Sequence, residues 1–197
     1  VRDGALERQF GYHGGKIERV RVSPDGGFVA SASGGQDEHS VRIWRAHSGQ
    51  PYRHYPIDAE IVDFGYAKDG ETLAVATRAG IQWLRASDGL LLRQVPVAGA
   101  SFGDQFSPDL EFLTTRETLQ DPPTFVQYVV VKVWRTADGA LHRSFRTSHL
   151  LAIPLAFSAD SKRLGILDFD DGRRVVRVWD IEENLLAATI PTETAAV

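Results

Sequence analysis

The sequence predicts an all-β protein built from four copies of a four-stranded antiparallel sheet. The main observation is an internal repeat, because four segments of the chain align with one another. Each segment has an apolar strand end, a small polar turn and a second apolar run, and a strand that carries a Trp follows it. Apolar residues nowhere keep the three-to-four-residue spacing of an amphipathic helix. The aligned segments are residues 20–33, 64–77, 104–117 and 155–168.

Two strands joined by a tight turn open each repeat. The turns are centred on Asp25, Asp69, Asp109 and Asp160. In the first two turns a Gly follows the Asp and supplies the positive φ that a tight reversal needs. We therefore expect the second strand of each repeat to pair with the first strand in antiparallel fashion.

The third strand of each repeat ends near a Trp, in the segments VRIW, GIQW, VKVW and VRVW. Their β-branched residues favour a pleated strand. We expect all four Trp residues, Trp44, Trp83, Trp134 and Trp179, to occupy one structural position. A turn and a fourth strand then complete the repeat. The predicted four-stranded sheets cover residues 15–56, 59–96, 100–146 and 151–191.

Residues 1–10 are predicted to form an orphan outer strand. The segment DGALERQF at 3–10 matches the fourth strand of the third repeat, ADGALHRSF, but the three strands that should precede it are missing. The last repeat already has its own fourth strand at 185–190. We therefore interpret residues 1–197 as one repeat region and a fragment of a longer array. The lack of Met agrees with a fragment, and the preference for Arg over Lys favours a bacterial origin.

The composition excludes several classes of protein. The chain has 197 residues, a net charge of −4 and no Cys, so disulfide scaffolds, thiol nucleophiles and Cys-based zinc sites are excluded. Its mildly acidic balance argues against nucleic acid as a partner. No apolar run is long enough to cross a membrane, and the first residues lack the apolar core of a signal peptide. These observations favour a cytoplasmic protein that binds neither nucleic acid nor membranes.

Several motifs resemble the WD-repeat (tryptophan–aspartate repeat) family. They are His13 before the first strand, the segment VSPDG at 22–26, the segment VRIW at 41–44 and the dipeptide Trp179-Asp180. The resemblance implies β-propeller blades. Since propellers of this family usually have six to eight blades, it also implies that four blades are part of a larger propeller. Two alternatives stay open, namely self-association of two half-rings and a strained four-blade closure.

The resemblance implies a structural hydrogen-bond network in the first repeat. Its members would be His13, Ser31 or Ser33, Asp37 and Trp44. The other repeats depart from this pattern. The second and third lack the His, the second also lacks the loop Asp, and the fourth has His149 one position out of register together with loop aspartates. We expect substitute partners for the indole N–H groups of those repeats, since a buried Trp N–H normally has an acceptor.

One connection points to a binding face. The insertions that make some repeats longer than others all fall in the connection between the second and third strands. The longest such insertion covers residues 116–130 and starts at Arg116. Insertions that gather on one face often mark the binding face. The segment Asp121-Pro122-Pro123 stiffens this connection, so that Phe125 and Tyr128 are presented to a partner. Alternatively, Phe125 folds back onto the neighbouring blade.

Charged residues near the starts of the first strands are further candidates on this face. They are Lys16, Glu18 and Glu60. By resemblance, such positions surround the mouth of the propeller channel and contact partners. The alternative is a solvated rim without a binding role.

No catalytic constellation is present in the sequence. The acidic run at 168–171 breaks the spacing of a calcium loop, and we interpret it as a hairpin tip at Asp171-Gly172. We therefore predict a non-catalytic scaffold that binds a protein or peptide and needs no cofactor or metal. One alternative is a regulatory or sensor propeller in a larger enzyme, linked to a kinase or protease. A weaker one is a propeller enzyme with a channel site. Beyond Asp104, its only charged candidates are Arg19, Arg21 and Asp63.

Overall fold

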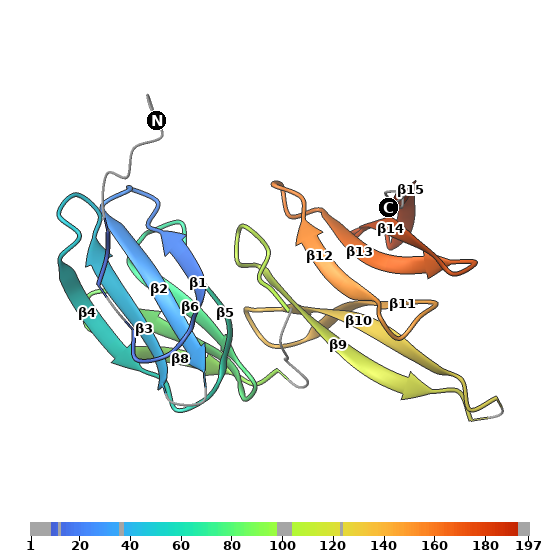
Figure 1. Ribbon diagram of the computed structural model, residues 1–197, viewed down its shortest axis with the longest axis horizontal. Coiled ribbons are helices and arrows are strands. Elements are labelled where there is room, and N and C mark those ends of the chain that lie inside the picture. Colours follow the sequence, from blue (N-terminus) through green and yellow to red (C-terminus); the bar gives the residue numbers. More distant parts are fainter. Residues whose placement is uncertain (1–8, 12, 36–37, 98–103, 123, 193–197) are drawn as a thin grey trace. The chain divides into compact units, whose positions relative to one another are not determined.

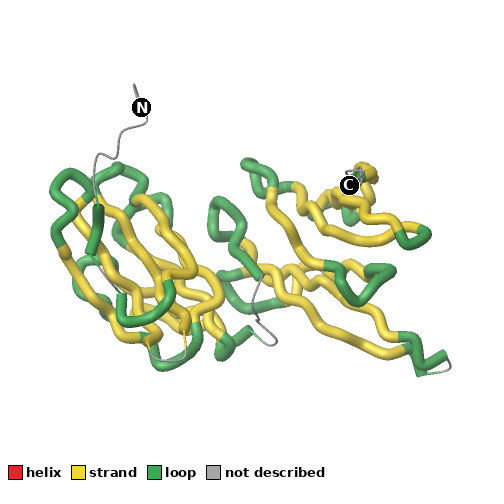
Figure 2. Tube along the Cα trace, in the orientation of Figure 1, coloured by secondary structure: helices red, strands yellow, loops and turns green. Residues whose placement is uncertain are grey.

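A computed structural model describes residues 9–11, 13–35, 38–97, 104–122 and 124–192. These residues form strands joined by turns and loops, and no helix occurs among them (Figure 2). The chain divides into two compact units, residues 1–94 and 95–197. Each unit contains two antiparallel sheets (Figure 1). The expected all-β fold made of propeller blades is confirmed.

The first unit holds two four-stranded sheets with simple up-and-down order. In both sheets, consecutive strands are neighbours, as in a meander. The first sheet consists of β1 (Ile17–Val22), β2 (Phe28–Gly35), β3 (Glu38–Arg45) and β4 (Pro51–Pro56). The second sheet consists of β5 (Ile61–Tyr66), β6 (Thr72–Thr77), β7 (Gly80–Arg85) and β8 (Leu91–Val95).

The second unit repeats this arrangement with one difference. Its first sheet has three strands in the order β11-β10-β9, and an isolated bridge between Phe106 and Leu113 stands where the other sheets have their first strand. This sheet consists of β9 (Phe112–Gln120), β10 (Gln127–Arg135) and β11 (Leu141–Arg146). The last sheet consists of β12 (Ile153–Phe157), β13 (Arg163–Asp170), β14 (Arg173–Asp180) and β15 (Leu185–Pro191).

The Asp turns have the expected geometry. The residue after each turn Asp has positive φ: Gly26 at 71°, Gly70 at 69°, Leu110 at 63° and Ser161 at 60°. In the last turn, the Ser158 hydroxyl and the amide of Lys162 donate to the Asp160 carboxylate. These hydrogen bonds lower the pKa of Asp160 below its usual value. We call the end of each sheet that carries these turns the turn end, and the opposite end the loop end.

A backbone hydrogen bond fixes equivalent positions in the four sheets. Directly after the third strand, an amide N–H donates to the carbonyl of the residue that precedes the second strand, over 2.7–2.9 Å. The donors are Ala46, Ala86, Thr136 and Ile181, which are therefore structurally equivalent.

The prediction that all four Trp residues share one position is wrong for Trp83. The other three precede the shared amide donor by two residues, whereas in the second sheet Leu84 has that place. Trp83 comes one residue earlier, and a shift of one residue in a strand turns the side chain to the opposite face. The Arg93 guanidinium lies over its ring, 5.0 Å from the centroid. Leu84, which is buried, packs in the core instead.

Each unit buries one apolar core to which both of its sheets contribute. In the first unit, Ile43 and Phe64 belong to one cluster of buried side chains. In the second unit, Val131, Leu164 and Ile181 do the same. The alternation of buried and exposed side chains is clearest in β10 and matches a strand with one face in the core.

Residues 1–10, which are predicted to form an orphan outer strand, lie mostly outside the described residues. Gln9 and Phe10 are described and are not in a strand. The Phe10 ring meets the Trp44 ring edge-on, with the centroids 6.5 Å apart.

Candidate functional site

The longest insertion continues the sheet instead of forming an irregular loop. β9 and β10 pair from Phe112–Arg135 out to Gln120–Gln127, so the insertion is an extended hairpin at the loop end (Figure 1). Arg116 and Tyr128 lie within these paired strands. Extended pairing satisfies the backbone groups that an irregular loop of this length would leave to solvent.

The tip of the hairpin presents two apolar side chains. Phe125 is 73% exposed and Val126 is 61% exposed. Two backbone hydrogen bonds close the tip. The Phe125 amide donates to the Asp121 carbonyl over 2.8 Å, and the Asp121 amide donates to the Val126 carbonyl over 2.9 Å. Phe125 has a φ of 56°, which a bulky residue adopts only when the surrounding turn imposes it. The alternative in which Phe125 folds back is not what the structure shows.

Charged side chains brace the strands behind the tip. The Arg146 guanidinium lies over the Tyr128 ring, 3.8 Å from its centroid, and reaches the Asp121 carboxylate at 3.8 Å. Across the hairpin, Lys132 pairs with Glu117 at 2.5 Å. Tyr128 is consequently half-buried under Arg146, whereas Phe125 projects from the braced hairpin. The arrangement combines an exposed aromatic side chain with a support that holds its position.

The candidate charges of the first unit are joined in local ion pairs. Lys16 contacts Glu18 at 3.0 Å, and Glu60 contacts Arg78 at 2.6 Å. The two members of the first pair differ in exposure, since 75% of the Lys16 side chain is accessible but only 20% of the Glu18 side chain. Exposed pairs of this kind contribute little to stability. They leave Lys16 available for a partner without identifying one.

A buried carboxylate links the first strands of the two sheets in this unit. Asp63 in β5 is fully buried, and the guanidinium groups of Arg21 and Arg19 in β1 approach it at 2.9 and 3.6 Å. A buried charge is stable only when it is paired in this way. Asp63 therefore pairs with both of the arginines considered with it for a channel site.

The first sheet contains the hydrogen-bond network that the WD-repeat resemblance implies, in the part that is described. The Trp44 indole donates to the Ser31 hydroxyl over 2.9 Å, and the His13 Nε2 lies 2.7 Å from the same oxygen. Ser31 rather than Ser33 is thus the acceptor for the indole. Asp37 lies outside the described residues.

The indole groups of the other sheets differ in their partners. Trp134 donates to the Thr115 hydroxyl over 2.8 Å, which is a substitute of the expected kind. The buried Nε1 of Trp83, by contrast, has no hydrogen-bond partner in the part of the chain that the structure describes. The positions equivalent to Ser31 in the second and fourth sheets carry Val75 and Ile166, which have no side-chain acceptor. Expecting a substitute was therefore wrong for Trp83.

A second network, missed in the sequence, fastens the start of the last sheet. Asp168 in β13 is buried and accepts hydrogen bonds from the Ser148 amide and hydroxyl at 2.9–3.2 Å, and from Arg177. His149 stacks on Phe169, with ring centroids 4.2 Å apart. The hairpin tip falls at Asp171 and Gly172, which both have positive φ. Ser148, in the connection before the sheet, was the one sequence signal for this network. Its partner Asp168 lies twenty residues farther along the chain, so the sequence alone did not indicate the pair.

Among the residues that the structure describes, no three His, Cys, Asp or Glu side chains come together in a way that could hold a metal ion. The same part of the chain has no helix that is long and apolar enough to span a membrane.

Comparison with solved structures shows the β-propeller fold. The chain resembles hydrazine synthase from Kuenenia stuttgartiensis (18% identity, TM-score 0.60), with 93% of this chain and 53% of that chain covered. It resembles the β-propeller domain of Cps50 (Swd1) from Myceliophteria thermophila (13%, 0.60), with 93% and 57% covered. It also resembles U3-55K (20%, 0.62), with 95% and 55% covered.

These similarities concern the fold alone. The chain spans just over half the length of the solved structures that it matches. No protein-family model matches the chain, and no curated protein matches it.

Proposed function

We propose that this chain is a non-catalytic interaction scaffold of the WD-repeat type, which binds a protein or peptide at the loop end of its sheets. The exposed tip of the β9–β10 hairpin carries the proposal, since Phe125 is 73% exposed on a braced support. Aromatic side chains that are already held in place lose little conformational entropy on binding and often dominate interfaces. Arg116, Tyr128, Lys16, Glu18 and Glu60 are proposed as surrounding contacts.

A capture experiment with a tip variant tests this proposal. Phe125→Ala combined with Tyr128→Ala removes both aromatic side chains, whereas Leu91→Ala removes an exposed apolar side chain (48%) from the outer strand β8. We expect the wild-type chain and Leu91→Ala to retain the same proteins from a lysate of the source organism. The double variant is expected to lose them while its melting temperature changes by less than about 3 °C. Equal retention by all three proteins would contradict the proposal.

A second candidate function is a regulatory propeller region within a larger enzyme. The fold similarity to hydrazine synthase is compatible with this alternative. The pairing of Asp63 with Arg19 and Arg21 argues against chemistry on these first strands, because it leaves the three charges occupied with one another. We therefore propose that the chain itself is not an enzyme. If a larger enzyme does contain it, the Phe125 variant should change the regulation of that enzyme and leave its catalytic step intact.

A further inference from the structure

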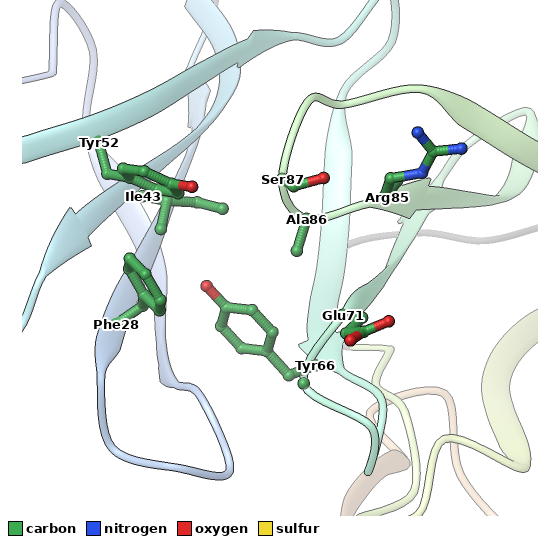
Figure 3. Close-up of a pocket in the computed structure, with 9 residues that line it drawn as sticks. Phe28, Ile43, Tyr52, Tyr66, Glu71, Arg85, Ala86 and Ser87 are labelled. Atoms are coloured by element: carbon green, nitrogen blue, oxygen red, sulfur yellow. The ribbon is translucent and has the colours of Figure 1, made fainter.

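A pocket of about 300 Å³ opens at the turn end of the first unit (Figure 3). Phe28, Ile43 and Tyr52 of the first sheet form one wall. Tyr66 at the end of β5 and Ala86 after β7 form the other wall. The three aromatic residues are partly buried and pack against the core of the unit. The pocket is therefore a gap in the core that opens to solvent.

The second unit shows what the gap would look like if it were filled. Ile181 is equivalent to Ala86, since its amide makes the same backbone hydrogen bond, and its side chain is fully buried. The surrounding frame is preserved. Phe28 and Tyr52 stack with centroids 4.8 Å apart, and the equivalent Phe112 and His142 do so at 4.9 Å.

A second pair of contacts confirms that the two frames correspond. Arg53 donates to the Ser87 carbonyl over 2.6 Å in the first unit, and Arg143 donates to the Glu182 carbonyl over 2.7 Å in the second. Ala86 has three carbons fewer than Ile181 at the equivalent position, which leaves part of this space open. Such a void forfeits packing energy that a bound apolar group would restore.

The other difference between the two units adds a polar group. Tyr66 is equivalent to Phe157. Tyr66 pairs with Leu73 and Phe157 pairs with Leu164, and each Leu is the second residue of its strand, β6 or β13. In Figure 3 the Tyr66 hydroxyl points from its own wall towards Phe28 and Ile43. This oxygen is buried and has no hydrogen-bond partner among the residues described. Burial raises the pKa of Tyr66 well above its ordinary value, so the hydroxyl remains a proton donor.

The charges around the pocket favour an uncharged occupant. The guanidinium groups of Arg45 and Arg53 already lie over the Tyr52 ring, at 4.7 and 4.2 Å from its centroid, and would repel a further cation. Arg85 at the rim is paired with Asp88 at 2.9 Å. Glu71, which also lines the rim, disfavours an anion.

We propose that this pocket binds one uncharged aromatic ring that carries an oxygen acceptor, the chemistry of a phenol or of a tyrosine side chain. The ring would pack between the Phe28–Tyr52 wall and Ala86, and its oxygen would accept a hydrogen bond from Tyr66. The volume is at the small end of ligand pockets and suits a single ring. Offset and edge-on contacts with the three aromatic residues would orient it.

Titration of the whole chain with p-cresol, followed by protein NMR, tests the proposal. We expect saturable shifts at the pocket residues, about tenfold weaker binding of toluene, and no binding of phenyltrimethylammonium. N-acetyltyrosine amide is titrated in parallel. Binding by both phenols indicates a site open to peptide side chains, and binding by p-cresol alone indicates a site for free phenols. Absence of saturable p-cresol binding at millimolar concentration would overturn the proposal.

Two variants separate binding from folding. Ala86→Ile installs the side chain of the second unit, so p-cresol binding should be lost while the melting temperature stays the same or rises. Tyr66→Phe should reduce p-cresol affinity about tenfold and leave toluene binding unchanged. Unchanged p-cresol binding in a folded Ala86→Ile protein would place the ligand elsewhere and overturn the proposal. If Ala86→Ile does not fold, Tyr66→Phe decides, because equal p-cresol affinity in that variant also contradicts the assigned site.

Discussion

The two units use the same frame of two packed sheets but differ at opposite ends of their strands. In the first unit the turn end is open, because Ala86 stands where the second unit has the buried Ile181. In the second unit the fully buried Ile181 stands at that position, and the loop end extends as a hairpin that ends in the exposed Phe125. Equivalent positions thus carry side chains of different size, and the smaller one lines a candidate site while it still belongs to the core.

The hydrogen-bond networks differ between the units in a similar way. The first sheet joins His13, Ser31 and Trp44 through one hydroxyl. The last sheet obtains a comparable attachment from Ser148 and Asp168. Different residues therefore fasten equivalent blades, which explains why the repeat motif is incomplete in most of the sequence.

The largest expected effect comes from emptying the filled position. Ile181→Ala should lower the free energy of unfolding by about 2–5 kcal/mol, because it removes a fully buried side chain from the core. Chemical denaturation measures the change, and Ala86→Ile is the matched reverse substitution. A loss below about 1 kcal/mol for Ile181→Ala would show that the two positions are not packed as the comparison requires.

A similar contrast exists between two turn glycines of the first unit. Gly89 has a φ of 76°, and an added Cβ would lie 2.4 Å from the Tyr55 ring; Gly26 has a φ of 71° with open space around it. Gly26→Ala should cost about 1–2 kcal/mol from backbone strain alone. Gly89→Ala should cost about 3 kcal/mol or more because overpacking is added. Equal melting temperatures for the two variants would contradict the close contact with Tyr55.

Removing one hydroxyl tests the network of the first sheet. Ser31→Ala leaves both the Trp44 indole and the His13 ring without their shared partner, and should cost about 1–3 kcal/mol. Thr115→Ala removes the acceptor of the Trp134 indole and should cost less. Thermal unfolding of the two variants gives the order. A smaller loss for Ser31→Ala would mean that His13 does not belong to the network.

The smallest effect concerns the Asp turns. Since hydrogen bonds from Ser158 and Lys162 lower the pKa of Asp160 in the folded state, the turn contributes stability above the unfolded pKa and loses it as the pH falls towards the folded pKa. Ser158→Ala should raise the pKa of Asp160 and weaken this acid dependence. Carboxyl NMR titration measures it, with Asp25 as an internal reference, whose pKa Ser23 lowers in the same way. An unchanged Asp160 pKa would contradict the role of the hydroxyl.

The repeats, their strands and their turns could be predicted because they depend on local sequence. An Asp followed by a residue of positive φ recurs at each turn, and alternating β-branched residues mark the strands. The error at Trp83 was also readable, since this Trp stands one residue farther from its turn glycine, Gly89, than Trp44 does from Gly49. The strand pattern alone does not fix the register, because either face of a half-buried strand accepts an aromatic residue.

The candidate sites were less accessible from the sequence. The hairpin tip was identified through the prolines and aromatic residues of one insertion, because its residues are neighbours in the chain. The pocket could not be found in this way. It depends on Phe28, Tyr66 and Ala86, which come from separate strands and turns, and on the absence of a few carbons at one position. The pairing of Asp168 with Ser148 escaped for the same reason.

Site-specific photo-crosslinking tests the proposed binding role of the hairpin most directly. p-Benzoylphenylalanine would be placed at position 125 of the tip, or at position 91 of the outer strand β8 as a control at another exposed apolar position. In cells of the source organism, the substitution at Phe125 should give a discrete adduct with a protein partner, and the substitution at Leu91 should not. Identical adducts at both positions, or a captured partner that never crosslinks to position 125, would contradict the claim that this hairpin is the binding element.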